Sequence, residues 1–432
     1  MPSWKFSVGN LVSRAARFPV AVSPALEAAE PLLLERLGNG YPDSEGALQW
    51  RSDGAYEIDF DLNELAETSD AADAPTGWRD LLLVLAGTPG LSANPPDWGT
   101  YGGRTALRFF RPVFQDVWVM PGESVRITGS IYRPSTSAGS TGTEVRVVDL
   151  TTGRQYDAVA VAFDDDGKVA EQTTTNTWLD FAVTIAADTA HTERRLYRVI
   201  VRPQASSYDA TTFGYISKSG ASGSPALFPE ADAFAVIGHH LPRGTTLTFV
   251  PQGGGTTVTL PLVQPSCYVV APGGTQLIQT WRLTIATPTA LRQSSPRPIF
   301  GEIWIGKART LLGGSPVLPI SVTEGDPNQV RVEGQRRRIE VLGEDVNPPA
   351  EMMLQFTFDT ASYQQARDEV ARLVRFGAEP LLLLPSDSFE GSGRLYHGRL
   401  GEEVTYQRIS PGTDEALRSF AWQFTESPLA AG

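Results

Sequence analysis

The region from Asp80 to Arg202 consists of short runs in which apolar and polar residues alternate, separated by turn sequences. Alternation with a period of two is typical of a strand that buries one face. The turn sequences contain glycine, proline or aspartate, as in TPG, MPGES, STSAGSTG and DDDG. Short strands at roughly ten-residue spacing predict a β-sandwich or jelly roll. The predicted strands are Asp80–Ala86, Thr105–Arg111, Gln115–Val119, Ser124–Tyr132, Glu144–Leu150, Ala158–Phe163, Trp178–Ala186 and Arg195–Arg202.

The rest of the chain is also rich in strand patterns. Residues Ala55–Leu62 alternate, and an apolar run at Ala233–Ile237 reads as a buried strand. One helix is predicted over Thr360–Phe376, with Gly377 as its C-cap. The fold class predicted is therefore mainly β: several β-sandwich or jelly-roll domains, with a small α+β domain at the C-terminus.

Charge and cysteine content narrow the function classes. The 432 residues carry a formal net charge of −13, which disfavours nucleic acid and anionic membrane surfaces as partners. A single cysteine, Cys267, excludes an intramolecular disulfide. The first residues lack the uninterrupted apolar core of a signal peptide, and no apolar run reaches membrane-spanning length. We expect no membrane insertion, and synthesis in a cytoplasm without a leader.

The strand-rich region interrupts another domain. The strand Ala55–Leu62 has no partner nearby in sequence, and a new apolar strand begins at Ala231, after a Gly/Ser-rich stretch. Insertion of a module into a surface loop explains this order. The predicted domains are an N-terminal arm and helix (1–40), a discontinuous sandwich (41–75 plus 226–315), an inserted jelly roll (76–225) and a C-terminal β-rich domain with one helix (316–432).

The segments that flank the insertion resemble a discoidin-like β-sandwich of tailed-bacteriophage tail-tip and baseplate proteins. In that family a Trp-Arg-Ser segment and a DLG-type strand precede a strand ending in GHNL, a W-R strand and a GR-W-G-type strand. The chain departs from the pattern at Asn63 and His240. The matching positions here are Trp50, Arg51, Ser52, Asp61, Leu62, Gly238, His239, Leu241, Trp281, Arg282, Gly301, Trp304 and Gly306.

Two further regions carry resemblances. The C-terminal region, above all GAEPLLLLPSDS and GRLYHGRLGE, resembles the β-rich domain of distal tail proteins, which form rings at the end of a phage tail tube. The inserted unit resembles galactose-binding-like jelly rolls of the carbohydrate-binding-module type, through FRPVFQDVWVMPGESVRITGSIYRP, EVRVVDLTTG, TWLDFAVTIAAD and RLYRVIVRP. Such modules bind glycans with exposed aromatic residues, and phage tail proteins also use them as architecture alone.

The pair His239-His240 is the first candidate site. Adjacent side chains of a regular strand point to opposite faces, so the two cannot converge on one metal ion. A zinc site also needs further convergent ligands. We expect a structural role at the end of a strand, and we predict no metal, cofactor or catalytic site in the chain.

The acidic sequence FDDDGK, from Phe163 to Lys168, raises the question of calcium. Its spacing does not fit an EF-hand loop. The alternative is a hairpin tip in which Asp-Gly closes two strands.

Two aromatic residues and one basic run complete the candidates. Trp98 and Tyr101 lie in the loop-like sequence NPPDWGTYGG, and exposed aromatic rings there would stack on sugar rings. Their alternative role is to cover the open end of the sandwich. Arg336, Arg337 and Arg338 form a dense basic run, either an inter-subunit contact with an acidic neighbour or a solvated hairpin.

The resemblances imply a non-enzymatic structural protein of the virion. It would assemble with copies of itself in a hexameric or trimeric ring at the distal end of the tail, contact neighbouring tail proteins, and bind a host surface glycan through the inserted module. The alternative is a secreted or virion-associated polysaccharide-degrading enzyme with accessory carbohydrate-binding modules. No nucleophile elbow, P-loop or zinc-protease helix is present in the sequence.

Overall fold

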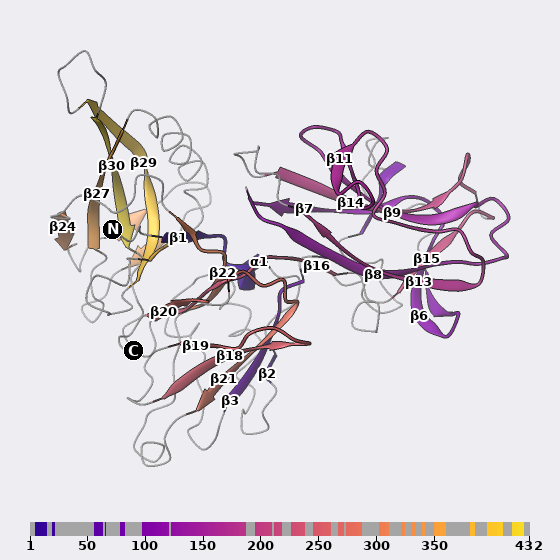
Figure 1. Ribbon diagram of the computed structural model, residues 1–432, viewed down its shortest axis with the longest axis horizontal. Coiled ribbons are helices and arrows are strands. Elements are labelled where there is room, and N and C mark those ends of the chain that lie inside the picture. Colours follow the sequence, from indigo (N-terminus) through magenta and orange to yellow (C-terminus); the bar gives the residue numbers. More distant parts are fainter. Residues whose placement is uncertain are drawn as a thin grey trace. The chain divides into compact units, whose positions relative to one another are not determined.

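The protein is described from a computed structural model, in which the chain forms two compact units (Figure 1). Unit 1 comprises residues Met1–Arg14, Phe18–Phe60 and Ala231–Gly432, and unit 2 comprises Ala15–Arg17 and Asp61–Glu230. The structure describes residues 5–14, 20–21, 56–63, 65, 78–82, 97–120, 122–186, 195–209, 211–217, 226–237, 245–260, 267–271, 274–286, 302–310, 321–324, 330–332, 339–341, 350–359, 381–384, 395–408 and 417–426.

The described elements of both units are almost entirely strands in antiparallel sheets, which confirms the predicted mainly β class. Helix α1 (Leu11–Arg14) spans a single turn. The predicted strand Asp80–Ala86 is wrong at Leu81 and Leu82, which are helical and follow β4. None of the helical residues described here forms a segment long and apolar enough to cross a bilayer.

Unit 2 is built from two sheets packed face to face. The first, called the β9 sheet, has the order β11 (Ala162–Asp164), β10 (Gln155–Asp157), β9 (Gly142–Asp149), β14 (Arg195–Gln204), β7 (Val113–Val119) and β4 (Arg79–Asp80), with β12 (Ala170–Gln172) also paired to β9. The second, the β8 sheet, has the order β13 (Thr177–Ile185), β8 (Val125–Arg133), β15 (Gly214–Ser217), β6 (Arg104–Phe109) and β5 (Asp97–Tyr101), with β16 (Ala226–Pro229) also paired to β8.

The core of unit 2 lies between these sheets. Alternate residues of each strand point inward, so Val145 and Val147 of β9 meet Ile127 and Ile131 of β8 in one apolar cluster. The inward side chains of β13 pack against the same cluster. The intervening residues of every strand therefore form the outer faces of the two sheets.

The predicted strand Ala158–Phe163 is wrong over its first four residues, and its last two, Ala162 and Phe163, belong to β11. Residues 158–161 form the turn between β10 and β11, where Asp157 Oδ1 accepts hydrogen bonds from the backbone N–H groups of Val159 and Ala160. Val161 takes a positive φ of 53° in this turn, and Val159 is 94% exposed. The alternating Ala-Val sequence mimics a strand, but the aspartate before it caps a turn.

The Asp-Gly sequence at 166–167 is a crossover and not the predicted hairpin tip, because β11 pairs with β10 whereas β12 pairs with β9. Gly167 lies against the backbone of β10, where a Cβ atom would approach the nitrogen of Asp157 to 2.5 Å. No group of three or more metal-ligating side chains occurs among the residues that the structure describes.

Unit 1 contains a large sheet in the order β23 (Arg309–Thr310), β1 (Lys5–Val8), β28 (Leu381–Leu384), β29 (Tyr396–Arg408), β30 (Leu417–Glu426), β27 (Ala350–Asp359) and β24 (Ser321–Glu324). A second sheet has the order β19 (Val258–Leu260), β18 (Thr246–Gln252), β21 (Thr280–Ala286), β3 (Tyr56–Asp61) and β2 (Val20–Ala21). Shorter groups are β20 (Cys267–Val270), β17 (Ala233–Ile237) and β22 (Glu302–Gly306), and the hairpin β25 (Val330–Val332) with β26 (Ile339–Val341).

The tryptophan motifs of unit 1 hold distant segments together. Trp281 is buried and packs with Phe234, at 4.7 Å between ring centroids. The next residue, Arg282, forms a bidentate pair with Asp59 of β3, with nitrogen–oxygen distances of 2.7 and 2.9 Å. Trp304 Nε1 donates to Ser7 Oγ at 3.0 Å, and a Cβ at position 306 would lie 2.6 Å from that oxygen, so a side chain there would displace this hydrogen bond.

A buried carboxyl group of unit 1 joins three segments. Asn10 Nδ2 donates to Glu302 Oε1 at 2.9 Å, and His397 Nε2 lies 3.2 Å from Glu302 Oε2. Burial raises the pKa of Glu302 to about 7, although the hydrogen bond from Asn10 acts in the opposite direction. The folded chain therefore keeps Glu302 protonated over a pH range in which an exposed glutamate is ionised.

We predict that unit 1 loses stability as the pH rises from 4.5 to 7. The unfolded carboxyl releases its proton near 4.5 while the folded one keeps it, so the free energy of unfolding falls across this window and is flat above it. A shift of this size corresponds to at most about 3 kcal/mol. Glu302→Gln, which mimics the neutral acid, should flatten the dependence.

Pulsed thiol labelling of Cys267 during urea unfolding measures this effect. Cys267 is the only cysteine of the chain, it is buried in β20, and burial raises the pKa of its thiol to about 12. Labelling therefore reports the opening of unit 1. The prediction would be contradicted if the wild-type urea midpoint increased between pH 4.5 and 7. It would also be contradicted if the midpoint of Glu302→Gln changed with pH as steeply as that of the wild type.

Candidate functional site

Aromatic side chains form a row across the outer face of the β8 sheet. Strand register places Trp178 beside Tyr132, Tyr132 beside Tyr215, and Tyr215 beside Arg108. The ring centroids are 5.1 Å apart for Trp178–Tyr132 and 5.7 Å for Tyr132–Tyr215. Since directly paired residues share one face of a sheet, this row continues over four strands. Tyr132 and Tyr215 are buried, whereas Trp178 is half-buried.

The β5–β6 hairpin lies over this row. Gly102 and Gly103 form its turn with φ values of 53° and 79°, which match the left-handed positions of a two-residue hairpin turn. Trp178 Nε1 donates to the carbonyl oxygen of Gly102 at 3.1 Å. A Cβ atom on Gly102 would be 2.8 Å from Trp178 Nε1 and 2.9 Å from the ring of Tyr132, so only glycine allows this approach.

Tyr101, one of the two predicted glycan-binding residues, belongs to this cluster. Its ring lies 4.1 Å from that of Tyr215 and folds over Gly99, where a Cβ would be 2.8 Å from the Tyr101 ring. Tyr101 is half-buried. Trp98 lies on β5 by its backbone, and its side chain lies outside the described residues.

Phe110 and Phe213 extend the aromatic cluster beyond Tyr215. The ring centroids are 5.8 Å apart for both Phe110–Phe213 and Phe213–Tyr215. The guanidinium of Arg108 lies over the rings of Phe110, Phe213 and Tyr101, at 5.0, 5.7 and 6.0 Å. The outer face of the β8 sheet thus presents half-buried rings on a base of buried ones.

A charged triad borders the aromatic row. Arg104 NH1 donates to Asp180 Oδ1 at 2.6 Å and to Ser130 Oγ at 2.9 Å, and Arg104 NH2 lies 3.3 Å from Asp180 Oδ2. Ser130 is fully buried and its hydroxyl donates to Asp180 Oδ1. The Arg104 guanidinium also lies 5.2 Å from the centre of the Trp178 ring.

The triad keeps its charges. Hydrogen bonds from Arg104, and then from Ser130, lower the pKa of Asp180, while the hydrogen bond to Asp180 raises the pKa of Arg104. Of the two side chains, Asp180 is 63% exposed and Arg104 is 30% exposed. This end of the row therefore offers an ionised acceptor and an ionised donor to solvent, next to aromatic carbon.

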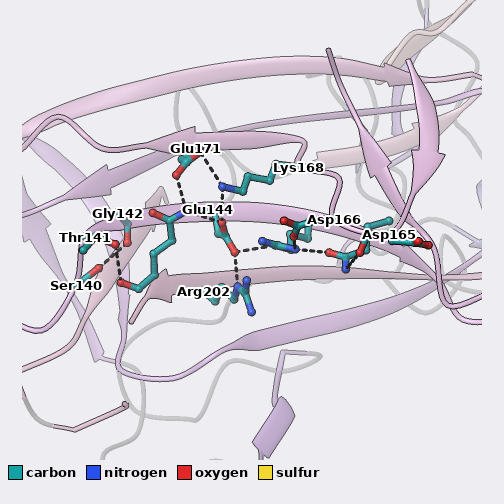
Figure 2. Close-up of polar contacts among 12 residues, drawn as sticks. Ser140, Thr141, Gly142, Glu144, Asp165, Asp166, Lys168, Glu171 and Arg202 are labelled. Atoms are coloured by element: carbon teal, nitrogen blue, oxygen red, sulfur yellow. Dashed lines mark hydrogen bonds and ion pairs between the residues drawn. The ribbon is translucent and has the colours of Figure 1, made fainter. Parts of the chain in front are cut away.

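The outer face of the β9 sheet is organised around a buried carboxylate. Figure 2 shows Glu144 pointing toward Arg202, with Lys168 and Glu171 on its other side. The side chain of Glu144 has no exposed area. It accepts hydrogen bonds from Arg202, from Arg146 Nε at 2.7 Å and from Gln204 Nε2 at 2.7 Å.

These donors determine the protonation state of Glu144. Burial alone would raise the pKa of this carboxyl, but the hydrogen bonds from Arg146, Gln204 and Arg202 outweigh it and hold the pKa below the ordinary value. A carboxylate held in this way does not act as a general acid. Its stabilising contribution is present above the unfolded pKa and is lost as the pH falls through the folded one.

The structure brings together residues that the sequence did not indicate as a site: Arg104, Ser130 and Asp180 with Trp178 at the aromatic row, and Glu144 with its donors on the other sheet. The aromatic residues of the inserted unit are predicted to lie mostly in the sandwich core, whereas Trp178 and Tyr132 lie on the outer face of the β8 sheet. The outward positions of β13, Trp178 and Asp180, are the one visible signal. The predicted contact residues Arg336–Arg338 lie outside the described residues, as do His239 and His240 and the predicted helix Thr360–Phe376.

Comparison with known proteins adds little to this geometry. No family model matches the chain, and a search of curated proteins found no match. Among solved structures, the N-terminal CBM22-1–CBM22-2 tandem domain of Xyn10C from Paenibacillus barcinonensis is similar at 11% sequence identity. The similarity covers 56% of this chain and 97% of that one, with a TM-score of 0.22. At this TM-score the fold assignment continues to rest on the strand pairings alone.

We predict that Glu144→Gln destabilises unit 2 by about 1–3 kcal/mol, because it removes the buried counter-charge that Arg146 shares with the one-third-exposed Arg202. Glu171→Gln is the matched control, since Glu171 is one-third exposed and the change should cost less than about 1 kcal/mol.

Hydrogen exchange of the β9 and β14 amides, measured across a urea titration, compares the stability of Glu144→Gln with that of Glu171→Gln. Equal midpoints for Glu144→Gln and Glu171→Gln would show that the buried carboxylate is not needed to hold this face of the sheet.

Proposed function

We propose that the chain is a non-catalytic structural protein of a bacteriophage tail tip or baseplate, in which unit 2 binds a glycan of the host surface. The observation that carries the glycan part is the aromatic row of the β8 sheet, bordered by Arg104 and Asp180. Sugar rings have apolar faces that stack on aromatic carbon, and hydroxyl edges that bond to charged side chains. This face offers both within one site.

The tail-protein part of the proposal rests on the sequence. Segments that resemble those of tail-tip proteins occur in family order on both sides of unit 2, ending with Trp281-Arg282 and Trp304 with Gly306. In unit 1 these residues have structural roles: Arg282 pairs with Asp59, and Gly306 leaves room for the hydrogen bond from Trp304 to Ser7. Packing roles of this kind fit a scaffold protein. We propose that copies of this scaffold form a ring in the virion, as a hexamer or trimer.

The state of the carboxylates supports a non-catalytic role. A glycosidase needs a carboxyl group with a raised pKa as its general acid, close to a second carboxylate. The pKa values of Glu144, Asp149 and Asp180 are all lowered. Arg104 is the main cause for Asp180, and hydrogen bonds outweigh burial for the other two. Glu302, on β22, has a raised pKa, but its side chain is buried and faces Asn10 and His397.

Two measurements test the scaffold proposal. The protein should be found in purified virions by mass spectrometry, and the purified full chain should sediment as a hexamer or trimer. A chain absent from virions would contradict a virion role. Release of reducing sugar from host envelope material by the full chain would favour the enzyme alternative.

We predict that Trp178→Ala and Tyr101→Ala each weaken glycan binding by about tenfold or more, because each removes a half-buried ring from the aromatic cluster. Trp178→Phe should keep most of the affinity, since it keeps an aromatic face. The measurement is a glycan-array screen with the full wild-type chain, followed by calorimetry on the variants.

Trp118→Ala is the matched control. Trp118 is 44% exposed on β7, in the β9 sheet, so its removal takes an exposed indole from the other sheet of unit 2. Affinity lost in Trp118→Ala and kept in Trp178→Ala would place the glycan on the β9 sheet. Absence of binding to any glycan in the wild type would mean that the aromatic row is purely architectural.

A further inference from the structure

The Arg104–Asp180 pair places two opposite charges at one end of the proposed glycan site. Both groups reach the surface, yet they are not free to move independently, because the buried hydroxyl of Ser130 accepts from Arg104 and donates to Asp180. Exposed ion pairs usually contribute little to the free energy of folding, because holding two long side chains in one geometry costs conformational entropy. Here three contacts fix the pair in place: the bidentate contact itself, the hydrogen bonds of Ser130, and the packing of Arg104 over the Trp178 ring.

The pair has hydrogen-bonding capacity that its contacts within unit 2 do not use. The two hydrogens of Arg104 NH1 are used by Ser130 and Asp180, and NH2 uses one on Asp180. A guanidinium carries five N–H donors, so donors remain on Nε and NH2. Each carboxylate oxygen accepts more than one hydrogen bond, and Asp180 Oδ2 receives only the long contact from Arg104 among the described residues.

Uncharged sugar substituents satisfy both partners. A hydroxyl group both donates and accepts, so neighbouring hydroxyls can donate to Asp180 and accept from Arg104. A uronic carboxylate has no proton to donate to Asp180 and is repelled by it. A charged amine would bind Asp180 but meet Arg104 beside it.

We propose that Asp180 is the specificity-determining residue of this site: by holding Arg104 in a bidentate pair beside the aromatic row, it restricts the site to uncharged glycans. The proposal rests on the glycan-binding function proposed above. Arg108, the other arginine of the row, lies over three aromatic rings at the far side of Tyr215 and is not part of the pair.

The charge of the pair is constant over the ordinary range of pH. Because Arg104 and Ser130 lower the pKa of Asp180, the carboxylate stays ionised wherever glycan binding is measured. Selection against anionic sugars should therefore depend on ionic strength and not on pH.

The test uses the full chain and matched pairs of hexasaccharides: gluco, manno and galacto forms and their uronic acid counterparts. The wild type should bind a neutral member at least about tenfold more tightly than its uronic counterpart, and added salt should narrow this ratio by screening the repulsion. Asp180→Asn releases the Arg104 charge, so it should bind the uronic form about tenfold more tightly than the wild type does.

Two further variants assign the effect to the pair. Asp180→Glu keeps the negative charge and should keep the exclusion of uronic sugars, which a merely structural role would not restore. In the double variant Asp180→Asn with Arg104→Gln, the gain in uronic binding should disappear. Thermal melting of each variant verifies folding, and the salt dependence of the wild type tests the proposal even if Asp180→Asn fails to fold.

The outcomes separate the two proposals. Equal wild-type affinity for neutral and uronic forms, or a folded Asp180→Asn variant with no gain, overturns the role of Asp180 and leaves glycan binding standing. A wild type that binds neither form of any pair overturns glycan binding at this face, and the role of Asp180 with it.

Discussion

Strand register in the β8 sheet is the constraint on which the candidate site depends. Trp178, Tyr132 and Tyr215 are adjacent because their strands pair at those positions, and the same pairing turns Leu179, Ile131 and Ile216 toward the core. A shift by one residue would exchange the two sets, exposing aliphatic side chains and burying Asp180 with its neighbours. The aliphatic core and the aromatic outer face are therefore two results of one register.

The class of the fold was accessible from the sequence, because period-two alternation is a local property. β3 (Tyr56–Asp61) lies within the alternating run Ala55–Leu62, and six of the eight strands predicted for unit 2 begin and end near their predicted bounds. One exception is Asp80–Ala86, in which Leu81 and Leu82 are helical. The other, Ala158–Phe163, alternates like a strand while Asp157 caps a turn. Local chemistry at the preceding residue outweighed the pattern.

The candidate site was only partly accessible, because its contacts are long-range. Tyr101 was predicted from its turn-rich context, but the residues that complete its surroundings lie on other strands. Arg104 and Asp180 are separated by 76 residues, and Arg104 and Ser130 by 26. Their convergence depends on which strands pair, and a single sequence gives no direct signal for that. The Glu144 cluster has the same origin, since Arg202 lies 58 residues from Glu144 along the chain.

The β5–β6 hairpin decides how much of this face is ordered before any ligand arrives. Its glycine turn lies against Trp178 and Tyr132, Tyr101 stacks on Tyr215, and Arg104 is fixed by Asp180 and Ser130. The rotamers of these side chains are therefore selected when unit 2 folds. The conformational entropy of these side chains is therefore lost when unit 2 folds and not when a ligand binds. A molecule that binds this face meets side chains that are already ordered, so binding costs less entropy.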